Sequence, residues 1–102
     1  MLFRSLEQLK AQNDRVEKNY LSEASLLDRK TKELVIIAAC IAHGDMVSHM
    51  QAHMHVAHKA GVSPEEILEM IQLLKNWVGG LAVIPGLEAW REIGRASCRE
   101  RV

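Results

Sequence analysis

The histidines are the residues of this chain whose type and spacing most directly suggest chemistry. All five lie between His43 and His58, in the stretch HGDMVSHMQAHMHVAHKAG. On a helix, which turns by about 100° per residue, His49 and His53 point the same way, so two titratable rings could exchange protons or bind a metal ion. His55 and His58 fall on the polar side of such a helix, where we expect solvent. The apolar residues on the face of His49 and His53 are Met46, Met50, Val56, Ala57 and Ala60.

Burial on that apolar face would change the protonation of His49 and His53. An imidazole that faces a core loses hydration, which lowers its pKa unless an acid lies close by. We therefore expect a neutral, hydrogen-bonded pair in the resting protein. One interpretation is that the two histidines are residues of a core or subunit interface whose ring nitrogens have hydrogen-bond partners. The other is that they line a pocket, and the sequence leaves both interpretations open.

Size and composition predict a single domain with a thin core. The 102 residues are 48% hydrophobic and 4% aromatic, so one copy buries mainly small and unbranched side chains, and we expect a homo-oligomer. No run approaches the roughly 20 apolar residues of a membrane span, and the amino end is too polar for a secretory signal. The default prediction is a cytoplasmic protein without a membrane partner.

The carboxyl end, IGRASCRERV from Ile93, resembles a translated sequencing adapter, and we interpret residues 93–102 as a non-native tail. Without its 3 basic and 1 acidic residues, the 13 basic and 13 acidic residues of the chain become 10 and 12, a net charge of −2 that disfavours a nucleic-acid partner. Cys40 is then the remaining cysteine, so no disulfide is expected within one chain. We expect the natural protein to continue beyond Glu92.

The elements that must position the histidines are predicted to be helices. Residues 1–25 form a helical arm with sparse apolar residues, either solvated or packed on a partner. Asp28 caps a helix from Arg29 to Ala42, whose run LVIIAACIA predicts burial on nearly every side. A buried parallel strand is disfavoured there because no second strand is available for pairing.

The histidine helix follows a turn at residues 43–45, with Asp45 as its possible cap, and ends at Gly61 in a left-handed conformation. The run Ser63-Pro64-Glu65-Glu66 predicts the start of another helix. Gly79-Gly80 breaks that helix, and residues 81–90 form a further helix interrupted at Pro85. The helix after Ser63 turns inward through Ile67, Leu68, Met70, Ile71, Leu74 and Val78.

Several motifs follow one another along residues 26–92. They are Asp28-Arg29-Lys30-Thr31-Lys32-Glu33-Leu34, His53 eight positions before Gly61, Ser63-Pro64-Glu65-Glu66-Ile67, Val78-Gly79-Gly80 and Ile84-Pro85. Taken in this order, they resemble the carboxymuconolactone decarboxylase family, whose superfamily includes the alkylhydroperoxidase D-like proteins. The resemblance implies an all-α, alkylhydroperoxidase D-like helical bundle whose protomers form dimers, trimers or hexamers.

The chain departs from the redox branch of this family. The motif of that branch is Cys-x-x-Cys-x-x-x-His, whose histidine aligns with His53 and whose cysteine positions hold Met46 and His49 here. Neither residue forms a thiolate, and Cys40 is interpreted as a buried packing residue. Because disulfide-based peroxide reduction needs two thiols, peroxidase or antioxidant activity is expected only as a family-level label, and the decarboxylase branch is the closer analogy.

The resemblance also implies that the glutamate of the Lys-Glu-Leu motif joins the proton relay, which gives Glu33, His49 and His53 as the predicted catalytic residues. An exposed first turn is the alternative place for Glu33. Glu33 lies twenty residues before His53, one more than the family spacing, and we place the extra residue in the turn around Gly44.

Such a trio suits a cofactor-free decarboxylation of a small lactone or keto acid. The substrate carbonyl accepts the electrons, so the protein need only stabilise an enolate and return a proton. We expect His53 to be the general acid or oxyanion donor, with Glu33 orienting its ring and His49 acting as donor or relay. The candidates for binding the negative charge of the substrate are Arg29, Lys30 and Lys32. The alternative for each of them is a solvated position on the surface.

A metal site is the second hypothesis. His49 and His53 place two imidazoles on adjacent turns of one helix face, a common arrangement for two ligands of a divalent transition metal such as zinc, iron or nickel. Asp45 or Glu33 would complete the ligand set, although the HExxH signature is absent. The third hypothesis is a non-catalytic protein in which the histidine face is the seam of an oligomer.

Overall fold

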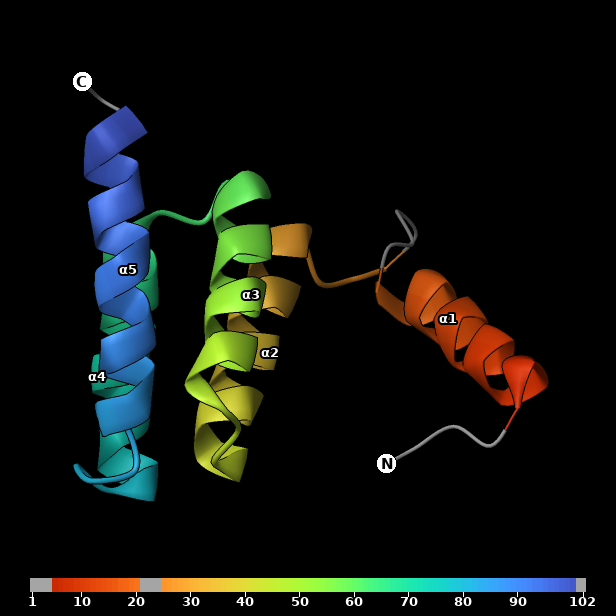
Figure 1. The fold of residues 1–102 in the computed structure, drawn as a ribbon, viewed down its shortest axis with the longest axis horizontal. Helices are drawn as coiled ribbons and strands as arrows, with labels where there is room; N and C mark the ends of the chain where they lie inside the picture. The colour runs from red at the N-terminus through yellow and green to blue at the C-terminus, as the bar shows by residue number, and fades with distance from the viewer. Residues whose placement is uncertain (1–4, 21–24, 101–102) are drawn as a thin grey trace.

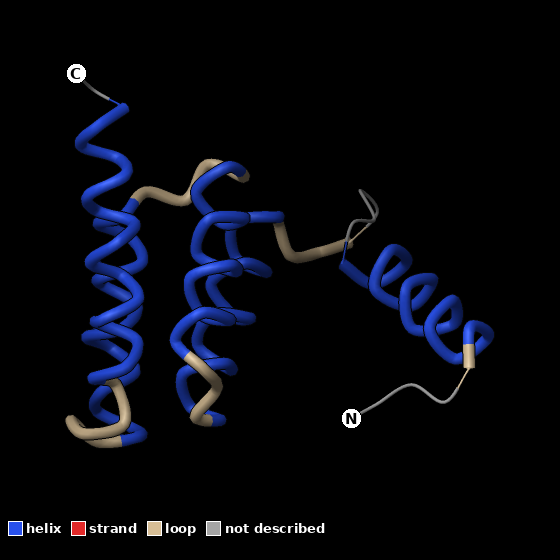
Figure 2. Tube along the Cα trace, in the orientation of Figure 1, coloured by secondary structure: helices blue, strands red, loops and turns tan. Residues whose placement is uncertain are grey.

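The computed structural model describes residues 5–20 and 25–100. Along these ranges lie the helices α1 (Leu6–Tyr20), α2 (Arg29–His43), α3 (Val47–Lys59), α4 (Pro64–Val78) and α5 (Ile84–Glu100). Figure 2 shows helices and loops but no strand in the described ranges, which confirms the predicted all-α fold. None of these helices is long and apolar enough to cross a membrane.

Helices α2 to α5 form two antiparallel hairpins that pack against each other (Figure 1). Helix α3 contacts both α2 and α5, and α4 contacts α5 and α2, so the four helices enclose one core. Helix α1 stands apart from this bundle in Figure 1, and its Leu6, Leu9 and Val16 are exposed. These three apolar side chains of the predicted arm therefore lie outside the core.

Helix ends form where the sequence supplies suitable caps. The Asp28 carboxylate accepts a hydrogen bond of 2.7 Å from the backbone N–H of Thr31. Ser63 and Glu66 form a reciprocal capping box, with hydrogen bonds of 3.0 and 2.9 Å. Gly61 has a φ of +102°, which confirms the predicted left-handed residue after α3.

Two predicted helix boundaries are wrong. Asp45 does not cap α3, because Met46 is the N-cap and makes no side-chain cap hydrogen bond, while the Asp45 carboxylate contacts His49 instead. Pro85 does not interrupt the last helix, since α5 begins at Ile84 and continues past Trp90. Proline fits the first turn of a helix because the N–H it lacks has no partner there in any case.

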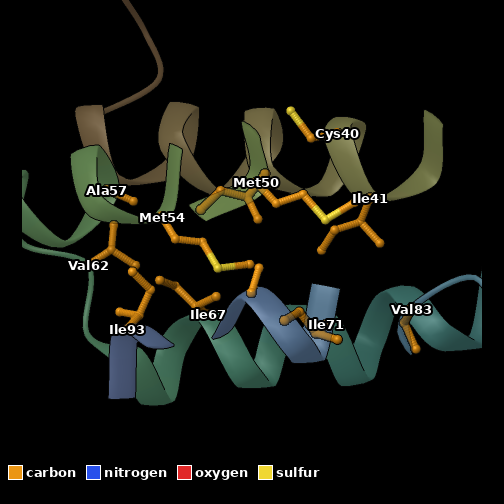
Figure 3. Packing of buried hydrophobic residues seen from close by; sticks show 12 residues of the cluster. Cys40, Ile41, Met50, Met54, Ala57, Val62, Ile67, Ile71, Val83 and Ile93 are labelled. Carbon is orange, nitrogen blue, oxygen red and sulfur yellow. The ribbon is translucent and has the colours of Figure 1, made fainter. Parts of the chain in front are cut away.

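The core lies between the two hairpins (Figure 3). Met50 and Met54 of α3 face Ile67 and Ile71 of α4, and all four side chains are fully buried. Ile93, which lies in the predicted non-native tail, is also buried, so it takes part in the packing whatever the origin of residues 93–102. The other buried apolar residues are Ile37, Cys40, Ile41, Ala57, Val62, Val83 and Ala89.

Burial of α2 on nearly every side was predicted, and this is wrong for the single chain. Val35 is 57% exposed, and Ala39 and Ala42 are exposed as well. The buried face of α2 carries Ile37 and Ile41 instead. One copy of the chain thus leaves an apolar face open, while self-association stays a prediction.

Gly86 marks a close approach between α5 and α2. A Cβ at Gly86 would lie 2.6 Å from Cδ1 and 2.9 Å from Cγ1 of the buried Ile41. We therefore expect Gly86→Ala to lower the free energy of unfolding by about 1–3 kcal/mol through overpacking. Gly94→Ala is the matched control, because its Cβ would meet nothing within 4 Å and it should stabilise the helix by about 0.5–1 kcal/mol. Urea unfolding measures both, and equal effects of the two substitutions would contradict the close approach.

Candidate functional site

His49 and His53 meet on one face of α3. Their Nε2 atoms lie 3.0 Å apart, and their ring planes are inclined by 65° with centroids 4.6 Å apart. At the other side of the His49 ring, Nδ1 lies 3.2 Å from Oδ2 of Asp45. The three side chains thus form a hydrogen-bonded chain with a spacing of four residues.

The Asp45 carboxylate determines where the protons of this chain lie. An ionised carboxylate only accepts hydrogen bonds, so it selects the His49 tautomer that carries hydrogen on Nδ1. His49 Nε2 then has a lone pair and accepts the hydrogen bond that His53 Nε2–H donates. We infer these tautomers from the bonding partners of the rings. The hydrogen-bonded pair expected from the sequence is present.

The two rings differ in exposure. The His49 side chain is 52% exposed, so the prediction that it faces the core is wrong, whereas His53 is half-buried. The buried stripe of α3 runs through Met50, Met54 and Ala57, which leaves the histidines at its edge. Burial lowers the pKa of His53, the neighbouring His49 acts in the same direction, and Asp45 opposes them. For His53, the expected fall in pKa is present.

The histidines outside the pair follow the prediction only in part. His43 and His55 are exposed. His58 is half-buried, and its Nδ1 lies 3.2 Å from the carbonyl oxygen of Val62, so its predicted place in solvent is wrong. This contact ties the end of α3 to the loop that follows, away from the pair.

Cys40 joins the pair from α2. It is 7% exposed, which confirms its predicted burial, but it is not isolated: the ligand atoms of Cys40, His49 and His53 all lie within 4.8 Å of one another. In Figure 3 the Cys40 sulfur points away from Met50 and Met54, the side chains that fill the core. Burial raises the pKa of the thiol, and the hydrogen bond and negative charge of Asp45 raise it further. The free thiol is therefore protonated at neutral pH.

The sequence contained a signal for this arrangement that the analysis of single helices missed. Cys40 and His49 lie five and four residues from Asp45, on opposite sides of the turn between α2 and α3. In an antiparallel helical hairpin, residues at similar distances from the turn come side by side. A helical hairpin of α2 and α3 would therefore bring the Cys40 thiol beside the histidines.

Glu33 lies on the buried side of α2 and pairs with Arg29. Its side chain is fully buried, and Oε1 accepts a hydrogen bond of 2.9 Å from Nε of Arg29. Glu33 is not part of the group formed by Cys40, His49 and His53. The alternative of an exposed first turn is wrong, because the Glu33 side chain is fully buried. Burial raises the pKa of Glu33 although a guanidinium lies beside it.

The third metal ligands offered by the sequence, Asp45 and Glu33, lie outside the group of Cys40, His49 and His53. Asp45 lies at Nδ1 of His49, whereas His53 lies at Nε2, on the other side of the same ring. A single metal ion bound by both Nε2 atoms is therefore directed away from the Asp45 carboxylate. Cys40 replaces Asp45 and Glu33 as the third donor that lies close to both rings.

An open depression of about 310 Å³ lies farther along α3, lined by Arg29, Val56, Lys59 and Ala60. Ala60 follows His53 by seven residues, which on a helix is two turns along the same face, or about 10 Å. Two cationic side chains at this depression favour an anion. Lys30 faces elsewhere, since its Nζ lies 3.1 Å from Oε2 of Glu66, and Lys32 is buried.

Fold and site together define an all-α protein with a cysteine and histidine cluster between two helices of one hairpin. The family model of the carboxymuconolactone decarboxylase family matches residues 7–92, so the chain belongs to this family. The match begins in α1 and therefore extends farther than the resemblance seen from Leu26. Searches among curated proteins and among solved structures found no match. Membership supports a decarboxylase-like or alkylhydroperoxidase D-like protein.

His53 should make the stability of the protein depend on pH. Its pKa is lowered from 6.5 in the folded state, so below pH 6.5 the unfolded chain binds more protons and the folded state loses stability. Above that pH both states are neutral, and the contribution disappears. The contribution of Glu33 to the pH dependence of stability has the opposite sign, because its raised pKa lets the folded state bind a proton more readily than the unfolded chain. We expect the free energy of unfolding of His53→Gln to fall less than that of the wild type between about pH 7.5 and 5.5.

Urea unfolding at a series of pH values measures this difference. His55→Gln is the matched control, since it removes an exposed histidine from the same helix. The assignment is contradicted if the His53→Gln protein keeps the pH dependence of the wild type.

Proposed function

We propose that this protein performs cofactor-free acid/base chemistry, with the decarboxylation of a small lactone acid or keto acid as its reaction. The observation that supports this proposal is the hydrogen-bonded chain from Asp45 through His49 to His53. A chain of this kind holds a proton at a defined atom, and its outer member exchanges protons with water.

The reaction needs little more than proton transfer from the protein. When the bond between the carboxylate carbon and its neighbour breaks, carbon dioxide leaves and the electron pair moves onto the adjacent carbonyl as an enolate. The enolate carbon then takes up one proton. In this proposal that proton comes from Nε2 of the His53 imidazolium, formed by uptake of a proton from solvent. The lowered pKa of His53 makes this imidazolium the stronger acid, and the ring is neutral once it has donated.

His49 and Asp45 restore the proton. His49 is half-exposed, so its ring can turn aside to admit the substrate and can take a proton from water. Asp45 holds hydrogen on Nδ1 of His49, which directs the incoming proton to Nε2 and from there to His53. This assigns Asp45 the orienting role that the sequence had given to Glu33.

The charge of the substrate is placed at the depression beside Arg29 and Lys59. Glu33 is a positioning residue here, because its buried carboxylate fixes the Arg29 guanidinium at the rim. The span of about 10 Å between the depression and His53 suits a substrate whose second acidic group lies well away from the reacting carbonyl.

The role of His53 leads to a prediction for turnover. His53→Gln removes the general acid, and we expect kcat to fall by about 10²–10⁴. The assay follows decarboxylation of carboxymuconolactone and of simple β-keto acids in the presence of a chelator, with peroxide reduction as a parallel reaction and His55→Gln as the control variant.

Three results would contradict this proposal in different ways. Equal turnover of His53→Gln and wild type would remove His53 from the reaction. Turnover of peroxide alone would favour the redox branch. If the wild type turns over neither class of substrate, and the His49→Gln and His53→Gln proteins lose their assembly in native mass spectrometry, the histidines form an oligomer seam.

Arg29 is expected to act in binding. Arg29→Gln removes a charged hydrogen-bond donor worth about 1.5–3 kcal/mol, so we expect KM to rise by about 10- to 100-fold while kcat changes little. Lys30→Gln is the matched control, since Lys30 pairs with Glu66 and does not line the depression. Steady-state kinetics with the same acids separate the two parameters, and a fall in kcat at constant KM would exclude a binding role.

A further inference from the structure

We propose that Cys40, His49 and His53 form a binding site for a divalent transition metal ion, with zinc as the preferred occupant and Asp45 as the residue that orients His49. The site combines one thiolate from α2 with two imidazoles from α3. It does not depend on the proposed function, because metal binding requires no particular substrate.

The distances between the donors are close to those of a tetrahedral site. With bonds of about 2.0 Å to nitrogen and about 2.3 Å to sulfur, two nitrogen ligands lie about 3.3 Å apart, and nitrogen and sulfur ligands about 3.5 Å apart. The two Nε2 atoms are 3.0 Å apart, and all three donors lie within 4.8 Å of one another. Side-chain shifts of about 1 Å therefore suffice to close the site around an ion.

Asp45 supplies the outer contact that such a site needs. A histidine that binds a metal through one nitrogen usually donates its other N–H to a carboxylate, which fixes the tautomer and the ring orientation. Asp45 already lies at Nδ1 of His49, so the His49 Nε2 lone pair faces Nε2 of His53, and Cys40 belongs to the same group of donors. The backbone N–H of Asp45 also bonds to the carbonyl oxygen of Cys40, at 3.1 Å, so Asp45 contacts two of the three donor residues.

Proton balance follows directly from the ligand set. Coordination releases the thiol proton of Cys40 to water, and the hydrogen of His53 moves from Nε2 to Nδ1, since only unprotonated donor atoms bind the ion. The ion then occupies the place of the proton shared by the two imidazoles. Metal and proton relay therefore exclude each other at these atoms.

The arrangement leaves room for a further ligand. Cys40 closes the inner side of the site, whereas His49 is half-exposed. Three protein ligands with one open side are typical of zinc sites that bind water or an exchangeable group. Zinc binds thiolate and imidazole ligands well, whereas hard cations such as magnesium prefer oxygen ligands.

Cobalt(II) is a suitable probe, because it takes the place of zinc and its thiolate bond gives a charge-transfer absorption. The experiment uses the full chain without a histidine tag, reduced and free of metal, with Cys98→Ser in every protein so that only Cys40 supplies a thiolate. We expect one cobalt per chain, a sulfur charge-transfer band, and loss of the band when zinc is added.

The variants identify the ligands. Cys40→Ser should abolish the charge-transfer band, and His49→Gln and His53→Gln should each weaken binding by at least about 100-fold. Asp45→Asn should weaken it by about 10- to 100-fold without changing the ligand set. His55→Gln, an exposed histidine of the same helix, should bind as the wild type does. A band that survives Cys40→Ser, or His49→Gln binding that equals His55→Gln binding, overturns the proposal.

X-ray absorption at the zinc edge of the Cys98→Ser protein keeps the test independent of whether the ligand variants fold. We expect one sulfur and two imidazole nitrogens around the ion. Absence of bound zinc, or a shell without sulfur, overturns the site. Decarboxylation measured with a chelator present reports on the proposed function alone, so the failure of one proposal is distinguishable from the failure of the other.

Discussion

The turn that joins α2 to α3 is the constraint on which the site depends. Gly44, with a φ of +79°, ends α2, and its N–H bonds to the carbonyl of Ile41, while the N–H of Asp45 bonds to that of Cys40. These two bonds are the Schellman pattern that terminates a helix with glycine. They hold the Asp45 backbone against Cys40, whose thiol has its pKa raised in part by the Asp45 charge. The Asp45 carboxylate reaches His49 in the first turn of α3. A residue with a Cβ adopts this φ only with strain, so one glycine keeps the thiol, the acid and the imidazoles within reach of each other.

Much of the fold could be predicted because local bonds determine it. The capping residues act within three residues of a helix end, so their partners are visible in a short window of sequence. They are Asp28, the capping box of Ser63 and Glu66, and the left-handed Gly61. Pro85 shows where a local pattern is ambiguous. Proline disfavours the interior of a helix and suits its first turn, and the pattern alone does not say which applies. The contact of Gly86 with Ile41 fixes how α5 lies on α2, and it joins residues that are far apart in the sequence.

The site was less predictable because its geometry depends on how the helices pack against one another. His49 and His53 share a face, as the helical repeat requires, but their depth depends on which stripe of α3 turns toward α4 and α5. The fully buried Met50 and Met54 occupy that stripe, so the rings lie at its edge. Glu33 was placed with His53 by resemblance to the family, and the local pattern did not show that Arg29, one turn earlier on the same helix, pairs with it. Cys40 was interpreted as filler because a lone cysteine in an apolar run has no pattern of its own. Only the pairing of α2 with α3 shows what lies beside it.

A histidine at position 49 excludes thiol chemistry there and favours proton transfer or metal binding instead. In the alignment expected from the family resemblance, Met46 and His49 stand at the two cysteine positions of the redox branch, so neither position offers a thiol. An imidazole at position 49 reaches the family histidine one turn later and forms the bond between the two Nε2 atoms. It also reaches Asp45, one turn earlier, through its second nitrogen. A cysteine there would offer a single sulfur and could not bridge both neighbours at opposite sides of a ring. His49 therefore connects an acid to an imidazole across about two helical turns, which is what either a proton relay or an oriented metal ligand requires.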